Sequence, residues 1–106
     1  MDLIEAAQNG NLQQVQELIK NGADVHAQND RAFMGACWNG HLPVVEYLLA
    51  HEANIHAQNE RALIYASENG HLPVVEYLLA HGANINVLSL EKQEMYRIYF
   101  PKNFTS

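Results

Sequence analysis

The stretch that decides the fold is NGHLPVVEYLLAH, which occupies residues 39–51 and returns letter for letter at residues 69–81. The match continues outside this stretch, since AQNDRA at residues 27–32 returns as AQNERA at residues 57–62. Both pairs are offset by 30 residues, from 39 to 69 and from 27 to 57. A period of this length is typical of stacked repeat architectures. The sequence therefore predicts one unit repeated along the chain.

Each unit reads as two short helices. The Asn-Gly pairs at residues 39–40 and 69–70 end the first helix, because glycine readily takes the left-handed conformation found there. Pro43 and Pro73 then fall in the first turn of the second helix, where a missing N–H is tolerated. The apolar residues of 42–49 follow helical spacing. They predict one buried face on the second helix.

Three units and a tail account for the whole chain. An Asn-Gly pair also stands one period earlier, at residues 9–10, so we expect units at 1–30, 31–60 and 61–90. One helix pair cannot bury its own apolar face, and each unit must therefore pack on the next. We expect residues 91–106 to cap the stack, and the chain to form one domain.

A helix pair ending in NGHLxVVxYLL-xHGANI resembles the ankyrin repeat, and the resemblance covers residues 1–90. It implies an all-α solenoid of stacked helix-turn-helix repeats. The family period is about 33 residues, and the missing residues fall just before Arg31 and Arg61, where the family builds a β-hairpin finger. We therefore expect short turns in place of these fingers. Such short units look like the ankyrin variants of giant viruses and intracellular bacteria.

Glu52 departs from the family pattern in a different way. It stands where Gly22 and Gly82 close the equivalent helices. A residue with a β-carbon is strained in the left-handed conformation by about 1 kcal/mol. We therefore expect Glu52 to destabilise the fold relative to glycine.

The resemblance also implies where a partner would bind. Arg31, Gly35 and Trp38 share one face of the first helix, and in ankyrin proteins this face and the adjoining turns line a concave groove that binds other proteins. The candidate binding residues are Glu5, Gln8, Gln28, Asn29, Asp30, Arg31, Trp38, Gln58, Asn59, Glu60, Arg61, Tyr65 and Glu68.

Trp38 is the most informative of these residues. Its equivalents in the other units are Gln8 and Glu68, which are polar, so we expect Trp38 to be at least partly exposed. Tyr65 on the next unit should lie near it, because packed helices are about 8–10 Å apart, and Gly35 should leave a notch between them. The interpretation as a binding residue competes with one in which Trp38 merely shields the core.

Charge and composition exclude several classes of function. The chain has 12 acidic and 6 basic residues and a net charge of −6, which disfavours nucleic acid and anionic membranes as partners. Residues 1–90 carry −7 and residues 91–106 carry +1. We interpret the acidic body as a solvated surface, with recognition of a basic partner as the alternative. One cysteine and no visible secretory signal indicate a reducing, cytoplasmic compartment, although export without a signal into a host cell stays open.

No pattern in the sequence predicts catalysis, a metal or a cofactor. The six histidines pair by the repeat, and equivalent residues one unit apart are too far from each other to share a metal. Cys37 occupies an alanine-like position and should be buried. We therefore expect a non-enzymatic, monomeric protein-binding module.

The tail is the basis of an alternative function. Met95, Ile98 and Tyr99 lie at helical spacing, and Pro101 ends the segment. We expect these residues to pack on the last unit as a cap. A docking motif is the alternative, and the chain would then be a self-associating scaffold that uses its aromatic tail.

Overall fold

The computed structural model describes residues 1–104, and the last two positions of the expected tail, Thr105 and Ser106, lie outside the described residues. Helices and turns account for the described part of the chain, which contains no strand. No helix in this part is long and apolar enough to cross a membrane. The α-helices are α1 (Leu3–Gln8), α2 (Leu12–Lys20), α3 (Ala27–Trp38), α4 (Leu42–Ala50), α5 (Ala57–Glu68), α6 (Leu72–Ala80) and α7 (Leu90–Tyr99), and two short 3-10 helices are η1 (Ile85–Val87) and η2 (Pro101–Asn103).

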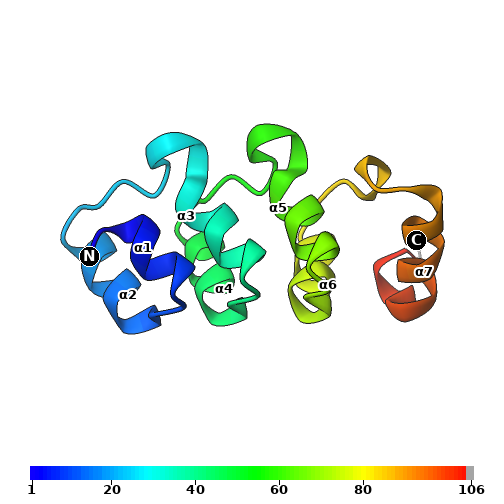
Figure 1. Ribbon diagram of the computed structural model, residues 1–106, viewed down its shortest axis with the longest axis horizontal. Helices are drawn as coiled ribbons and strands as arrows, with labels where there is room; N and C mark the ends of the chain where they lie inside the picture. Colours follow the sequence, from blue (N-terminus) through cyan, green and yellow to red (C-terminus); the bar gives the residue numbers. More distant parts are fainter. Residues whose placement is uncertain (105–106) are drawn as a thin grey trace.

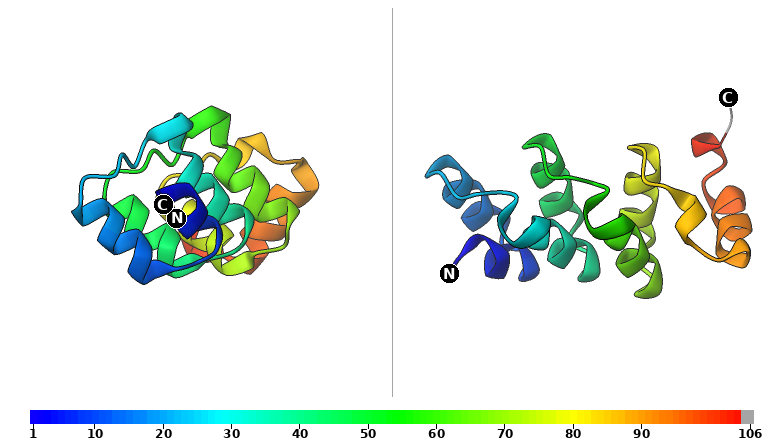
Figure 2. Two further views of the ribbon diagram at one scale, coloured as in Figure 1. Left: turned by 60° about the vertical axis from the view of Figure 1, so that its left-hand side comes forward. Right: turned by 90° about the horizontal axis from the view of Figure 1, so that it is seen from above.

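The helices form a two-layer stack that measures 41 × 23 × 21 Å. Figure 1 shows the pairs α1/α2, α3/α4 and α5/α6 side by side along the long axis, with α7 at the C-terminal end. In each pair the two helices pack together, and α3 packs between α1 and α5. The N-terminus and α7 lie at opposite ends of the molecule in the view from above (Figure 2). The all-α repeat stack expected from the sequence is confirmed.

The core repeats with the same period as the sequence. Two sets of equivalent positions are fully buried in all three units, one on the first helix and one on the second. They are Ala6, Ala36 and Ala66, and Val15, Val45 and Val75. Small alanines let the first helices approach one another, while the valines fill the space between the layers. Each unit packs on the next through these equivalent positions. The same core residues must therefore recur in every unit.

Short left-handed turns replace the β-hairpin fingers. Residues 28–30 have φ values of 54°, 59° and 63°, and residues 58–60 have 51°, 59° and 67°. Each turn projects from the edge of the stack ahead of the right-handed part of α3 or α5 (Figure 1). A run of left-handed residues costs about 1–2 kcal/mol per residue unless other contacts hold it. The expectation of short turns is confirmed, but their handedness needs an explanation.

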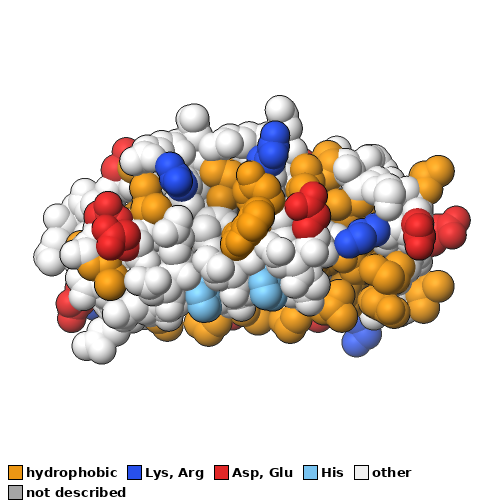
Figure 3. All heavy atoms as spheres, in the orientation of Figure 1, with side chains coloured by type: hydrophobic (Ala, Val, Ile, Leu, Met, Phe, Trp, Pro, Cys, Tyr) orange, Lys and Arg blue, Asp and Glu red, His pale blue; other side chains and the backbone are white. Residues whose placement is uncertain are grey.

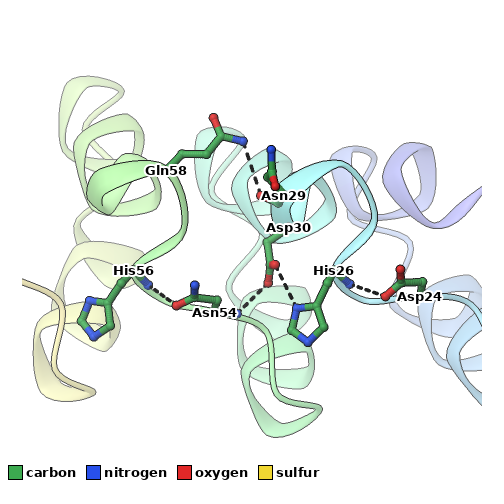
Figure 4. Close-up of polar contacts among 7 residues, drawn as sticks. All are labelled: Asp24, His26, Asn29, Asp30, Asn54, His56 and Gln58. Carbon is green, nitrogen blue, oxygen red and sulfur yellow. Dashed lines mark hydrogen bonds and ion pairs between the residues drawn. The ribbon is translucent and has the colours of Figure 1, made fainter.

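Buried carboxylates hold these turns in place. The Asp30 carboxylate accepts hydrogen bonds from His26 Nδ1 at 2.9 Å and from the Asn54 backbone N–H at 2.6 Å, as Figure 4 shows. The His26 contact lies within the turn, whereas Asn54 belongs to the connection that leads into the next unit. The hydrogen bond from His26 to Asp30 also raises the pKa of His26 above 6.5, with a smaller electrostatic contribution from the same carboxylate.

The second turn repeats this arrangement. The Glu60 carboxylate accepts hydrogen bonds from His56 Nδ1 and from the Asn84 backbone N–H, the latter at 3.2 Å. Asp30 and Glu60 are both buried, so their side chains do not face the groove as the sequence suggested. The reason is that a left-handed turn directs these carboxylates inward, where they satisfy backbone N–H groups of the following unit.

The tail packs on the last unit, but through a different face from the expected one. Tyr96 is buried, and its hydroxyl lies 2.7 Å from the Ser67 hydroxyl. Lys92 Nζ donates to the Ser67 carbonyl at 3.1 Å. Ile98 and Tyr99 are 76 % and 52 % exposed, so the expectation that they pack inward is wrong. Of the three residues expected to pack inward, only Met95 is half-buried against the core.

Candidate functional site

An open cavity of about 460 Å³ lies across the first helices of the stack. Residues from α1, α3 and α5 and from the turns line it. They are Gln8, Gln28, Arg31, Met34, Gly35, Trp38, Asn39, Gln58 and Tyr65. Figure 3 shows hydrophobic side chains gathered over α3 and α5, with basic side chains above them and acidic side chains on either side. We call this cavity and the adjoining Arg61 side chain the groove.

Two aromatic rings form the apolar part of the groove. Trp38 is 44 % exposed, which confirms the expectation that it is partly exposed. The rings of Trp38 and Tyr65 meet edge to face, with centroids 4.7 Å apart and planes at 76°. This geometry is favourable for aromatic pairs. The Trp38 ring and the half-buried Tyr65 ring therefore place an apolar surface in contact with solvent in the groove.

The backbone of Trp38 is fixed by the following unit. His71 Nε2 and Asn69 Nδ2 both donate to the Trp38 carbonyl, at 2.9 and 3.1 Å. The preceding unit shows the same contacts, in which His41 Nε2 and Asn39 Nδ2 donate to the Gln8 carbonyl at 3.0 and 3.2 Å. The end of each first helix is therefore held by two side chains of its neighbour, and the groove residues stand on a rigid support.

Two arginines border the aromatic pair. Arg31 Nη1 donates to Gln28 Oε1 at 3.2 Å, and the Arg61 guanidinium carbon lies 6.0 Å from the centroid of the Tyr65 ring. Both side chains are exposed. Among the described residues, neither guanidinium forms an ion pair with a carboxylate. Two positive charges therefore stand unpaired beside an apolar surface.

Neighbouring turns are also joined to each other. Gln58 Nε2 donates to the Asn29 carbonyl at 3.4 Å, as Figure 4 shows. This contact links the edge of one unit to the edge of the next and gives Gln58 a place in the cavity wall. It adds a polar rim to the groove on the side of the turns.

Gly35 lies where the first two units pack together. A β-carbon at Gly35 would lie 2.6 Å from Cγ of Gln8, which packs against this glycine from the preceding unit. Gly35 therefore allows close packing of α1 on α3, and it also lines the cavity together with Trp38 and Tyr65.

The remaining candidates lie elsewhere. Glu5, Asn29 and Asn59 are exposed but do not line the cavity. Glu68 lines a separate, smaller hollow beside Lys92. The sequence reasoning also missed two residues of the cavity wall. They are Met34 and Asn39. Met34 follows Arg31 by three positions, so helical spacing alone could have placed it on the same face.

The cysteine and two of the histidines have packing roles in the structure. Cys37 is fully buried, and burial raises the pKa of its thiol well above the ordinary range, so a thiolate is strongly disfavoured. His51 and His81 stack on Tyr47 and Tyr77, with ring centroids 4.1 and 4.0 Å apart. Within residues 1–104, no three side chains of the kinds that bind metals come together.

Comparison with known proteins agrees with this geometry. A family model described as ankyrin repeats, in three copies, matches residues 3–89. No match was found among curated proteins. Ankyrin repeats are modules of protein–protein interaction. Because the matched region includes all three helix pairs and most of the chain, the protein belongs to the ankyrin-repeat family.

Proposed function

We propose that the protein binds a partner protein through the groove. The observation that carries this proposal is the exposed Trp38 ring, which meets the half-buried Tyr65 edge to face beside the unpaired Arg31 guanidinium. Tryptophan, tyrosine and arginine are the residues that most often dominate binding energy at protein interfaces. Packing within the stack gives no reason for the Trp38 ring to lie open to water.

The support beneath the groove favours tight recognition. Side chains of the following unit hold the Trp38 carbonyl, and Gln58 joins two turns. A surface that is already ordered loses little conformational entropy when a partner binds. The mechanism we propose is therefore rigid presentation of side chains, without a large conformational change.

The resemblance of the short repeats to those of giant viruses and intracellular bacteria supports one class of partner. On that basis we propose a role as a host-directed factor, acting on a cytoplasmic protein of the host cell. The groove residues Arg31, Trp38, Arg61 and Tyr65 would make the main contacts, and the exposed turn residue Gln28 would form the rim.

A pull-down from cell lysate tests the groove. Wild type is compared with Trp38→Ala/Tyr65→Ala and with Glu46→Gln/Glu76→Gln, which changes two exposed equivalent positions on the second helices. Circular dichroism establishes that all three proteins are equally folded. We expect the wild type and the control to capture a protein that the aromatic variant does not capture. Each hot-spot residue that is truncated should cost roughly 2 kcal/mol or more of binding free energy. Capture by all three proteins contradicts the proposal.

A second function is favoured by the outer face of α7. Leu90 and Ile98 are 77 % and 76 % exposed, and Tyr99 is 52 % exposed, although they lie on a helix that otherwise packs on the stack. Such a face could join two copies of the chain into a self-associating scaffold. Light scattering over a concentration series separates the two functions. A monomer throughout supports the groove alone, and a dimer abolished by Ile98→Asn supports the scaffold.

A further inference from the structure

We propose that the groove selects an acidic, extended peptide segment, in which two carboxylates three residues apart flank an apolar side chain. This inference rests on the proposed function and names the chemistry of the partner. The arginines would bind the carboxylates, and the pair of Trp38 and Tyr65 would bind the apolar side chain.

The first argument is that the two guanidiniums are unpaired in an acidic protein. Residues 1–90 contain ten acidic residues and only three basic ones. Two of these three bases, Arg31 and Arg61, border the groove, and among residues 1–104 neither pairs with a carboxylate. In such a chain a surface arginine could readily find an acidic neighbour. Their availability gives this face a local charge opposite to that of the protein.

The second argument explains why the arginines stay free. Each is preceded in sequence by an acidic residue, Asp30 or Glu60, which is the obvious internal partner. Both carboxylates are buried beneath the turns and accept hydrogen bonds from histidines and from backbone N–H groups of the next unit. The left-handed turns thus separate each carboxylate from the arginine beside it.

The third argument concerns spacing. Arg31 and Arg61 occupy equivalent positions in adjacent units, and neighbouring packed helices are about 8–10 Å apart. A polyproline II segment rises about 3.1 Å per residue and has three residues per turn. Its side chains at positions i and i+3 therefore share one face about 9 Å apart. A segment of this kind places two carboxylates at the spacing of the repeat.

The fourth argument is the apolar surface below the arginines. The exposed ring of Trp38 meets that of Tyr65, and Met34 also lines the cavity. A leucine between the two carboxylates would meet this surface. The exposed Glu5 lies on α1, and the exposed Glu68 lies at the C-terminal end of α5, so the favourable potential covers α3 and the N-terminal part of α5 only. This limits the selected segment to a short one.

Trp38 provides the readout, because it is the only tryptophan of the chain. Its fluorescence is followed while a proline-containing peptide with a Glu-Pro-Leu-Glu core is added. The matched peptides carry Gln-Pro-Leu-Gln, or the same residues with the two glutamates adjacent. We expect the first peptide to bind saturably and roughly threefold to thirtyfold more tightly than the matched peptides. It should weaken as salt rises from about 0.05 to about 0.5 M, since exposed charges are screened.

Protein variants then assign the contacts. Arg31→Gln/Arg61→Gln should weaken the binding of the acidic peptide by roughly threefold to thirtyfold, which is the range expected for the loss of two exposed ion pairs. Lys20→Gln/Arg97→Gln removes the same charge outside the groove and should change binding less than twofold. Equal binding of the acidic and neutral peptides, no binding of either, or equal effects of the two variants would overturn the proposal.

Failure of this inference can be told from failure of the proposed function. If the protein captured from lysate is lost with Trp38→Ala/Tyr65→Ala but kept with Arg31→Gln/Arg61→Gln, the groove binds protein and the acidic selection is wrong. If neither variant loses it, the groove itself is not the binding surface. If both lose it and the acidic peptide competes with it, both proposals hold.

Discussion

Glu52 is the clearest case in which one residue works against the fold. It adopts φ = 74° where Gly22 and Gly82 adopt 95° and 97°, so it takes the left-handed conformation expected from the repeat. The strain of Glu52 in this conformation is about 1–2 kcal/mol. Substitution by glycine relieves the strain, but part of the gain in stability is offset because glycine has a larger conformational entropy in the unfolded state.

We therefore expect Glu52→Gly to raise the free energy of unfolding by about 0.5–1 kcal/mol. Denaturant titration measures it, as a higher midpoint at an unchanged slope. Glu52→Ala is the matched control, because it removes the same charge and keeps the β-carbon. A midpoint for Glu52→Gly no higher than that of Glu52→Ala would refute the explanation by backbone strain.

A second residue couples the turn to pH. The hydrogen bond to Asp30 raises the pKa of His26 above 6.5, with smaller contributions from Asp24 and Glu52. A histidine with a raised pKa in the folded state contributes stability that is fully present below its unfolded pKa. That stability is lost as the pH rises through the folded pKa.

We expect His26→Gln to cost most stability below pH 6.5 and progressively less above it. Thermal unfolding at pH values from about 5.5 to 8 measures the difference from wild type. In an Asp30→Asn background, the same substitution should show little dependence on pH. A cost that grows with pH, or one that is unchanged by Asp30→Asn, would contradict this role.

At the scale of the elements, predictability depends on whether the sequence repeats. The helix pairs could be derived, because NGHLPVVEYLLAH at residues 39–51 and 69–81 shows the same caps and the same buried face twice. The turn length also followed from the period. Its left-handed conformation did not, because a count of missing residues says nothing about the direction in which Asp30 and Glu60 point.

Helix α7 shows the opposite case. It occurs once, so no second copy indicates which of its faces packs on the stack. Apolar spacing pointed to Met95, Ile98 and Tyr99, whereas Tyr96 is the buried residue and Ser67 supplies its hydroxyl partner. Ser67 is polar, so the sequence suggests that it lies on the surface, although it is buried against Tyr96. An argument that assigns the buried face of α7 from its apolar residues alone therefore selects the wrong face.

At the scale of the whole molecule, the candidate site was only partly predictable. The aromatic pair and Arg31 could be placed on one groove, because equivalent positions of adjacent units must lie side by side. The contacts that fix Trp38 could not, since they join its carbonyl to His71 and Asn69, which the sequence presents only as the link between two helices. Every residue has a backbone carbonyl, so the sequence does not indicate which carbonyl accepts a hydrogen bond from another unit.

The contacts between units also give the stack a direction. Each turn carboxylate reaches forward to a backbone N–H of the next unit, while His41 and His71 reach back to a carbonyl of the unit before. At the equivalent position of the first unit, Asn11 instead caps its own helix. The stack is therefore polar, and its two ends differ in the hydrogen-bonding groups that they present. Association that continues these contacts must be head to tail, and it forms a ring if the rotation between copies closes and an open filament if it does not.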